Sequence, residues 1–257
     1  MLVKPLLGAP LLTHHPLAYG LVGCWLFNEG AGLIAADSSG QGNHGTLSHT
    51  HLTNMPTWVA GPNGGALAFS LNPYGGYVKI PDSQSLSVLS DFTLLARILP
   101  TNWLSNYGIV EKVDVSNING YAMRMQNTTG KILGLVYDGV GSAGVLGLAA
   151  LSTTIYSSVG VSFRDSTDKM QLWRNGAPDG AEGACTKAPT DGSNFLCIGT
   201  RGNDQYDSFV GLISDVMIWN RALSAEEISY LYHHPYAMFD PAGMETGPGI
   251  PIYGTGV

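Results

Sequence analysis

The chain has 257 residues, of which 44% are hydrophobic, so it can bury a sizeable core in one large all-β domain or two small ones. Only 12% of the residues are charged, and 34 Gly and 14 Pro favour short strands and tight turns over long charged helices. The net charge of −7 argues against nucleic acid as a partner, because phosphate contacts need clustered Lys and Arg. No stretch approaches the roughly 18 apolar residues of a membrane helix, so we expect no membrane partner.

The first 20 residues have the character of an extended arm. Pro5, Pro10 and Pro16 deny regular strand pairing. Pro5, Pro10 and the pair His14-His15 interrupt any signal-peptide core, so no secretory signal is expected. An arm without apolar periodicity cannot order itself. We therefore expect it to pack either into a partner chain or against the chain's own body.

Residues 21–220 consist of short apolar or alternating segments separated by Gly, Asn, Asp and Ser clusters, which is typical of a β-sandwich or jelly roll. In segment 91–99, alternate residues from Phe92 to Ile98 are apolar, as expected of a half-buried strand. The pair Asn175-Gly176 predicts a tight hairpin turn. Strands are expected at 21–27, 65–70, 76–80, 91–99, 107–111, 120–126, 131–137, 144–150, 155–163, 169–174, 194–199 and 208–219.

One short helix is predicted after the last strand. Ser224 and Glu227 form a capping box, Leu223 and Ile228 occupy the staple positions, and the helix should end before Pro235. The tail, 234–257, has too little apolar periodicity to fold alone and is expected to be a linker or docking strand. The chain thus divides into an arm at 1–20, a sandwich at 21–233 and a tail at 234–257.

The cysteines Cys24, Cys185 and Cys197 are too few and too irregularly spaced for a zinc module. One alternative is a bridge between Cys185 and Cys197 across a hairpin. The other is three buried thiols that act as small apolar residues, which is favoured because Cys24 lies in an apolar run.

Two segments at opposite ends of the sandwich carry a family resemblance. The first contains W-x-F-x-E-G followed by D-x-S-G-x-x-N-x-G, between Trp25 and Gly45. The second reads I-x-D-V-x-I-W-N-R-A-L-S, from Ile213 to Ser224. Together they resemble the opening and closing strands of the laminin-G-like jelly roll, a concanavalin A-like fold of two antiparallel sheets. The resemblance implies an all-β sandwich with a short C-terminal helix, in which strands 21–27 and 212–219 are neighbours.

Because the first and last strands of such sandwiches are neighbours, polar groups from both ends could converge on a structural Ca²⁺ ion. Calcium takes several hard oxygen ligands. The candidates are Asp37, Asn43 and Asp215, with Glu29 as an outer ligand. The alternative is that the acidic and amide side chains only brace turns by bonding nearby amides.

The same fold carries β-glucanases, so an enzyme has to be considered. Retaining glycosidases need two carboxyl groups about 5 Å apart, and the glucanase relatives supply them from one strand as E-x-D-x-x-E. No glutamate of this chain has that spacing, and Glu111 with Asp114 suits a loop or calcium role better. We therefore expect no enzymatic activity and assign no catalytic residue.

Sugar sites in sandwiches combine an aromatic platform with amide and carboxylate groups. The candidates on loops are Trp103, Arg201, Asp204 and Tyr206. The other tryptophans considered lie in predicted strands and are expected in the core: Trp25, Trp173 and Trp219.

The flanks of the sandwich, 15–20 and 232–239, resemble those of single-domain proteins encoded among tailed-phage structural genes. The resemblance implies a structural protein on the virion surface, as a capsid decoration, fibre or tail component. Its arms would contact other virion proteins or further copies of the chain, and its loops would face a surface glycan. The alternatives are a secreted or cell-surface adhesion module, which would be extracellular, and a β-glucanase-type hydrolase.

Overall fold

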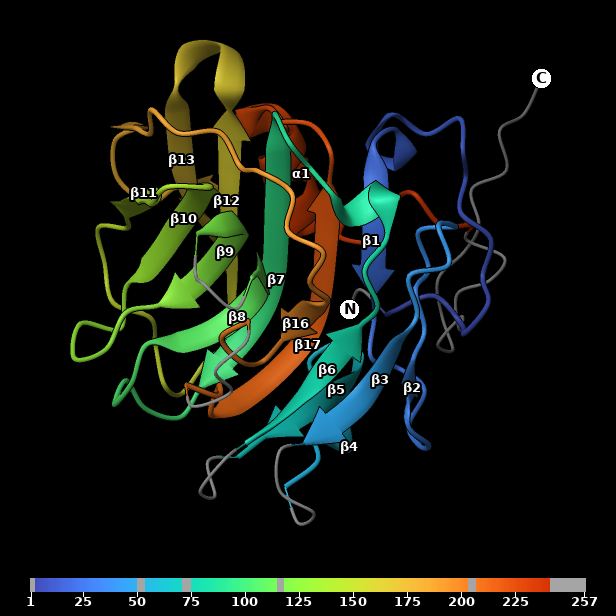
Figure 1. The fold of residues 1–257 in the computed structure, drawn as a ribbon. Helices are drawn as coiled ribbons and strands as arrows, with labels where there is room; N and C mark the ends of the chain where they lie inside the picture. The colour runs from blue at the N-terminus through green and yellow to red at the C-terminus, as the bar shows by residue number, and fades with distance from the viewer. Residues whose placement is uncertain (1–2, 50–53, 71–74, 115–117, 203–206, 241–257) are drawn as a thin grey trace.

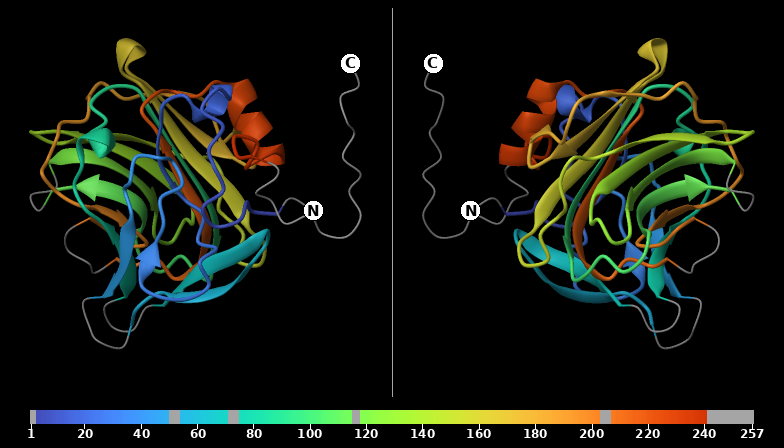
Figure 2. Two further views of the ribbon diagram at one scale, coloured as in Figure 1. Left: turned by 90° about the vertical axis from the view of Figure 1, so that its right-hand side faces the viewer. Right: turned by 90° about the vertical axis from the view of Figure 1, so that its left-hand side faces the viewer.

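The computed structural model describes residues 3–49, 54–70, 75–114, 118–202 and 207–240. Within them, two antiparallel sheets face each other as a sandwich (Figures 1 and 2), which confirms the predicted fold class. One sheet has nine strands: β14 (Ala177–Pro178), β13 (Lys169–Arg174), β12 (Ser157–Arg164), β7 (Phe92–Pro100), β17 (Gly211–Trp219), β5 (Gly64–Phe69) and β4 (Thr57–Gly61), with β1 (Leu21–Trp25) on β17 and β15 (Gly183–Ala184) on β13.

The other sheet has eight strands within the described residues: β11 (Ser142–Leu146), β10 (Ile132–Asp138), β9 (Asn119–Met125), β8 (Tyr107–Val113), β16 (Leu196–Ile198), β6 (Gly76–Ile80), β3 (Gly45–His49) and β2 (Ile34–Ala35). The helical elements are η1 (Pro16–Ala18), η2 (Gln84–Leu86), η3 (Asp165–Thr167) and α1 (Ala225–His233).

Each predicted strand has a counterpart in these sheets. Strand β1 ends at Trp25 rather than Phe27, because Phe27 adopts a left-handed conformation with φ of 50°. Strands β3 and β4 were not predicted, since few of their residues are apolar in alternation and the pattern does not distinguish them from loops. Strands β2, β14 and β15 have two residues each, which is too short for an alternating pattern to predict them.

The first and last strands are neighbours, as the two motifs implied. Strand β1 pairs with β17 in an antiparallel register that places Leu21 opposite Trp219 and Trp25 opposite Val216. The two ends of the sandwich sequence therefore close on one another in the middle of the nine-stranded sheet.

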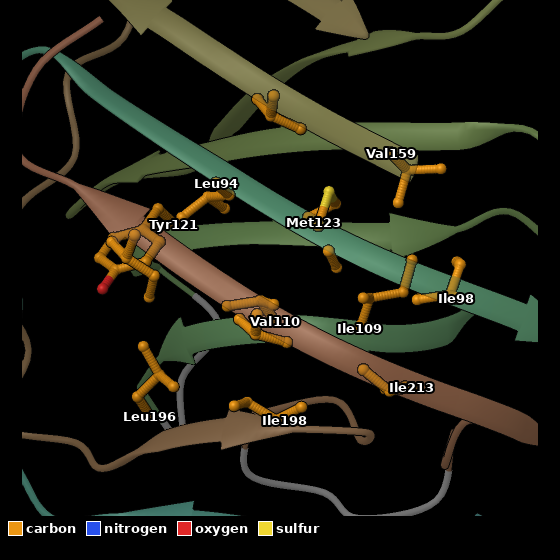
Figure 3. Close-up of a cluster of buried hydrophobic side chains, with 14 of the residues drawn as sticks. Leu94, Ile98, Ile109, Val110, Tyr121, Met123, Val159, Leu196, Ile198 and Ile213 are labelled. Atoms are coloured by element: carbon orange, nitrogen blue, oxygen red, sulfur yellow. The ribbon is translucent and has the colours of Figure 1, made fainter. Parts of the chain in front are cut away.

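The main core fills the space between the sheets (Figure 3). The face of β7 predicted to be apolar lies in it, with Leu94 and Ile98 fully buried against Ile109 of the opposite sheet. Trp25 is also fully buried there, as predicted.

A second apolar core covers the outer face of the nine-stranded sheet. It contains Leu95 of β7 together with Trp173 and Trp219, and α1 contributes Ile228 and Leu231. Strand β7 is therefore covered on both faces, which corrects the prediction of a half-buried strand. The physical reason is that α1 and the terminal segments supply an outer layer that the alternation of one strand cannot reveal.

The described parts of both arms belong to this outer layer. The N–H of Leu12 donates to Met238 O at 2.8 Å, and the N–H of Asp240 donates to Pro10 O at 3.1 Å. Phe239 forms an isolated antiparallel bridge with Leu11. The arms thus pair with each other and pack on the chain's own sandwich, which is the second of the two alternatives. Residues 1–2 and 241–257 lie outside the described part.

The capping box of α1 is present as predicted. The N–H of Glu227 donates to Ser224 Oγ at 3.2 Å, and the N–H of Ser224 donates to Glu227 Oε2 at 2.9 Å. The three cysteines are free and buried, so Cys185 and Cys197 do not form a bridge. Burial raises the pKa of all three thiols.

Candidate functional site

Two of the loops predicted to bind sugar lie side by side at one end of the sandwich. The loop after β7 contains Trp103, and the loop after β16 contains Arg201. They are joined where the N–H of Thr101 donates to Val210 O at 3.0 Å and where the Ser105 hydroxyl donates to the Asp207 carboxylate. The fold therefore places Trp103 and Arg201 on neighbouring loops.

Trp103 is packed rather than free. Gly130 covers one face of the indole, with φ of 64°, and a Cβ added there would lie 2.6 Å from the ring. The N–H of Thr128 donates to Trp103 O at 2.7 Å, and the ring is partly buried against the main core. The indole N–H is buried and makes no hydrogen bond with the described residues. Trp103 thus forms the base of the loop rather than an exposed platform.

The exposed apolar group at this end is Leu104, which sequence reasoning missed and which is 81% exposed. On either side of it, Asn102 Oδ1 accepts from Tyr107 Oη at 2.5 Å, and Asn106 Oδ1 accepts from the N–H of Asn127 at 3.1 Å. The Asn102 and Asn106 amide nitrogens make no hydrogen bond with the described residues, so they can donate to a ligand. No periodicity could identify Leu104, because its exposure follows only from the turn.

Arg201 is held in place by an ion pair, since its Nη1 donates to Asp207 Oδ2 at 2.7 Å. The adjacent Gly202 N–H donates to Glu111 Oε2 at 3.1 Å. Glu111 is fully buried in β8 and forms a two-bond ion pair with Arg124 of β9, at 2.5 and 2.8 Å. Glu111 therefore lies in a strand, not in a loop as predicted, and its carboxylate is occupied by Arg124 and by the Gly202 N–H rather than facing a calcium ion. Asp204 and Tyr206 lie outside the described residues.

The residues predicted to bind calcium have their oxygens occupied by hydrogen-bond donors of the chain. The Asp37 carboxylate accepts four hydrogen bonds, from the N–H groups of Cys24, Ser39 and Asn43 at 2.9 Å each and from Ser39 Oγ at 2.8 Å. Asn43 Oδ1 accepts from the Ser83 hydroxyl at 2.7 Å. These oxygens are already turned toward donors, so the turn-bracing alternative describes them better than a metal site.

The polar partners of Asp215 lie outside the turn that contains Asp37 and Asn43. Its Oδ2 accepts from Tyr236 Oη at 3.1 Å and lies 3.8 Å from Arg97 Nη1. Beside it, the buried Lys4 Nζ donates to Ser214 O at 2.7 Å. Asp215 thus holds the C-terminal arm through Tyr236, while Lys4 of the N-terminal arm bonds to the neighbouring Ser214, and the residues do not fit a Ca²⁺ site. In the described part of the chain, no group of three or more His, Cys, Asp or Glu side chains could hold a metal ion.

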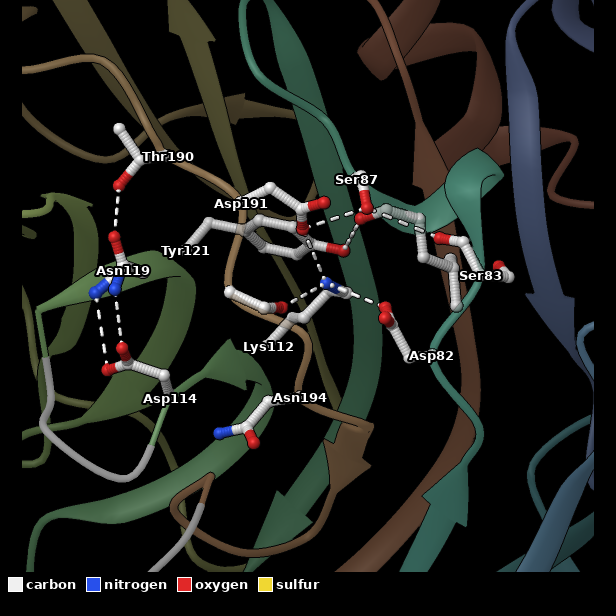
Figure 4. A network of polar contacts seen from close by, with 12 residues as sticks. Asp82, Ser83, Ser87, Lys112, Asp114, Asn119, Tyr121, Thr190, Asp191 and Asn194 are labelled. Carbon is white, nitrogen blue, oxygen red and sulfur yellow. Dashed lines mark hydrogen bonds and ion pairs between the residues drawn. The ribbon is translucent and has the colours of Figure 1, made fainter.

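Another polar cluster lies on the eight-stranded sheet, around Lys112 of β8 (Figure 4). Its Nζ is buried and lies 3.0 Å from Asp82 Oδ1 and from Asp191 Oδ1. Asp114, beside this cluster, accepts from the N–H of Ile118 at 3.0 Å and from the N–H of Asn119 at 3.3 Å, and so braces the start of β9.

The family model described as "Concanavalin A-like lectin/glucanases superfamily", Laminin_G_3, matches residues 72–229. The chain belongs to this superfamily. Similar solved folds include the binding domain of Paraclostridial Mosquitocidal Protein 1, with a TM-score of 0.65 at 16% identity over 84% of this chain and 52% of that one. Domain 4 of AbnA, a GH43 extracellular arabinanase from Geobacillus stearothermophilus in complex with arabinotriose, gives 0.63 at 16% over 82% and 98%.

The binding domain of botulinum neurotoxin serotype G is similar too, with a TM-score of 0.63 at 16% identity over 83% of this chain and 50% of that one. This chain thus spans about half the length of the two toxin binding domains. At such identity the likeness establishes the shared fold alone. None of the helices in the described part of the chain is long and apolar enough to cross a membrane.

Glycoside hydrolysis requires two closely spaced carboxyl groups. Asp82 and Asp191 approach each other because both contact Lys112. Burial is the strongest single influence on Asp191 and acts to raise its pKa, but the hydrogen bonds from Lys112 and Ser87 and the charge of Lys112 together outweigh burial, so the pKa is lowered. A general acid needs a raised pKa. This pair of carboxylates is therefore arranged for an ion-pair network rather than for glycoside hydrolysis.

Proposed function

We propose that this member of the superfamily is a non-enzymatic, lectin-like protein that binds carbohydrate at the end formed by Trp103, Leu104 and Arg201. The observation that carries the proposal is the pair of joined loops, which present amide donors of Asn102 and Asn106 beside an exposed leucine. Sugars are recognised by apolar contact combined with a few fixed polar groups. The arabinotriose-bound domain with the same fold supports a sugar as the ligand class.

The test is a glycan array followed by titration calorimetry of the best ligand. Leu104→Asp should weaken binding by about tenfold or more, which corresponds to about 1.4 kcal/mol, because it removes the exposed apolar contact. Leu89→Asp is the matched control, because Leu89 is also exposed but lies before β7, whereas Leu104 lies after β7. Binding that Leu104→Asp leaves unchanged, or no binding by the wild-type protein, would contradict the proposal.

We further propose that the protein is a structural component of a tailed-phage virion, displayed on the surface as a capsid decoration, fibre or tail protein. The support is the sequence resemblance of its flanks. Because the described arm residues pack on the chain itself, contact with other virion proteins is assigned to 241–257 and to the exposed Leu6 and Leu7. Deleting 241–257 should leave the melting temperature unchanged and abolish incorporation into particles, measured by mass spectrometry of purified virions.

The second candidate is an extracellular adhesion or carbohydrate-binding module. It is favoured by the likeness to domain 4 of AbnA, which this chain covers almost completely and which belongs to an extracellular enzyme. Recovery of the protein in culture medium, without associated particles, would support this candidate over the virion protein.

A further inference from the structure

A groove of about 610 Å³ runs along α1, between this helix and the hairpin of β13 and β14. The helix stands on the outer side of the sandwich (Figure 2). One wall of the groove consists of the hairpin residues Gly176, Ala177 and Pro178. The other wall is a single face of α1, whose residues recur at helical spacing: Glu226, Ser229, Tyr230 and His233. From Glu226 to His233 this wall is about 10 Å long, because the helix rises about 1.5 Å per residue.

The helical wall carries exposed aromatic rings. Tyr230 is 46% exposed, and its ring centroid lies 4.8 Å from that of His234. Tyr232 is 37% exposed, and its ring centroid lies 5.0 Å from that of His233. Neither imidazole makes a hydrogen bond with another described residue, so both can contact a ligand. Grooves lined by aromatic rings bind proline-rich segments in the polyproline II conformation.

The C-terminal segment of the chain, which lies outside the described residues, contains a sequence of this kind. Pro248-Gly249-Ile250-Pro251 is a P-x-x-P motif. In a polyproline II helix the two prolines are about 9 Å apart, at about 3.1 Å per residue, which matches the length of the helical wall. Glu245 is the only charged side chain in 241–257 and precedes the motif by three residues. Its carboxylate can accept a hydrogen bond from the imidazole of His233 at the end of the groove.

The segment begins on the side of α1 that lies away from the groove. The N–H of Asp240, the last described residue, donates to Pro10 O at 3.1 Å, and Tyr236 bonds to Asp215 of β17. From β17 to β14 there are four strand spacings, about 19 Å in total. A chain from Asp240 to Pro248 spans at most about 28 Å. It would also have to pass around α1, which is about 10–12 Å across with its side chains. The groove of a neighbouring copy can be reached without this constraint.

We propose that the groove between α1 and β14 binds the P-x-x-P motif of a neighbouring copy of this chain. The prolines pack between Tyr230 and Pro178, and Glu245 bonds to His233. Because the segment of one copy enters the groove of the next, the contact is heterologous and links copies into a ring or a filament. The inference rests on the proposed virion role, in which 241–257 makes the assembly contact, and it names the surface that receives this segment.

The test is fluorescence anisotropy with a labelled synthetic peptide of residues 242–257 and the full-length protein. The wild-type protein should bind the peptide saturably. Tyr230→Ala should raise the Kd by about tenfold or more, because it removes the central ring of the groove. Tyr19→Ala is the matched control, since Tyr19 is 76% exposed but does not line the groove. A peptide with Pro248→Ala/Pro251→Ala should bind more weakly by a similar factor. Thermal melts verify that each protein variant is folded.

The proposal is overturned if the wild-type protein does not bind the peptide, if Tyr230→Ala leaves the Kd unchanged, or if Tyr19→Ala weakens binding equally. Binding that appears only when Pro248 and Pro251 of the protein itself are replaced would show that the segment occupies the groove of its own copy, which also overturns the contact between copies.

Incorporation into particles separates this inference from the virion role. If deletion of 241–257 abolishes incorporation but Tyr230→Ala does not, the virion role stands and the groove is not the receiving surface. If the deletion has no effect, the virion role of the segment fails, whatever the peptide binds.

Discussion

Replacing Phe239 by alanine is expected to destabilise the isolated protein, because the ring belongs to the protein's own second core. Phe239 is 1% exposed and packs beside Tyr236 and Met238, with Leu11 of the N-terminal arm across from it. Truncation of a buried Phe costs about 3–5 kcal/mol. A terminal segment can detach while the rest of the protein stays folded, so the decrease in the free energy of unfolding cannot exceed the free energy of detaching this segment. We therefore expect about 3 kcal/mol.

This loss should lower the melting temperature by about 6–12 °C, given about 2–4 °C per kcal/mol for a domain of this size. Thermal and denaturant unfolding at several protein concentrations measure it, and the shift should not depend on concentration. Leu7→Ala is the control, because Leu7 lies in the other arm and is exposed. A stability equal to that of the wild-type protein, with loss of binding to a partner chain instead, would refute our account of the arms.

Three further predictions concern buried polar groups and the calcium site first expected of them. Burial lowers the pKa of Lys4 from its usual 10.5 to about 8, so between these values the unfolded chain holds more protons than the folded one. The free energy of unfolding should therefore rise with pH across this window, and Lys4→Met should remove the rise, measured by denaturant unfolding at a series of pH values. Asp37→Asn should cost about 1–3 kcal/mol, because an amide nitrogen would face two donors. Adding calcium or a chelator to the wild-type protein should leave its melting temperature unchanged, whereas a rise with calcium would reveal a site that the donor geometry argues against.

The sequence alone predicted most of the elements that carry a local signal. The period of two in β7, the Asn175-Gly176 turn and the capping box of α1 depend on neighbours within a few residues. The pairing of β1 with β17 was also predicted, but through family resemblance and not through local pattern. Strands β3 and β4 were missed, because their own residues show no clear alternation: β3 is held by pairing with β6, which is distant in the chain, and β4 by the hairpin that it forms with the adjacent β5.

The sequence predicted which loops form the candidate sugar site, but not which of their side chains are packed and which are exposed. Trp103 was predicted as a platform, yet Gly130, 27 positions along the chain, covers its ring and leaves Leu104 as the exposed group.

The tertiary structure alone decided the partners of the buried charges and the fate of the arms. In the sequence, Asp37 and Asp215 are equivalent candidates for oxygen ligands, but the partners of each carboxylate depend on which groups the fold places beside it. Asp37 meets backbone N–H groups of its own turn, whereas Asp215 meets Arg97 and Tyr236, which are far from it in the chain. Likewise, an arm without periodicity shows only that it needs a surface to pack on. The outer face of the nine-stranded sheet supplies that surface, and it exists only once β7, β12, β13 and β17 have come together.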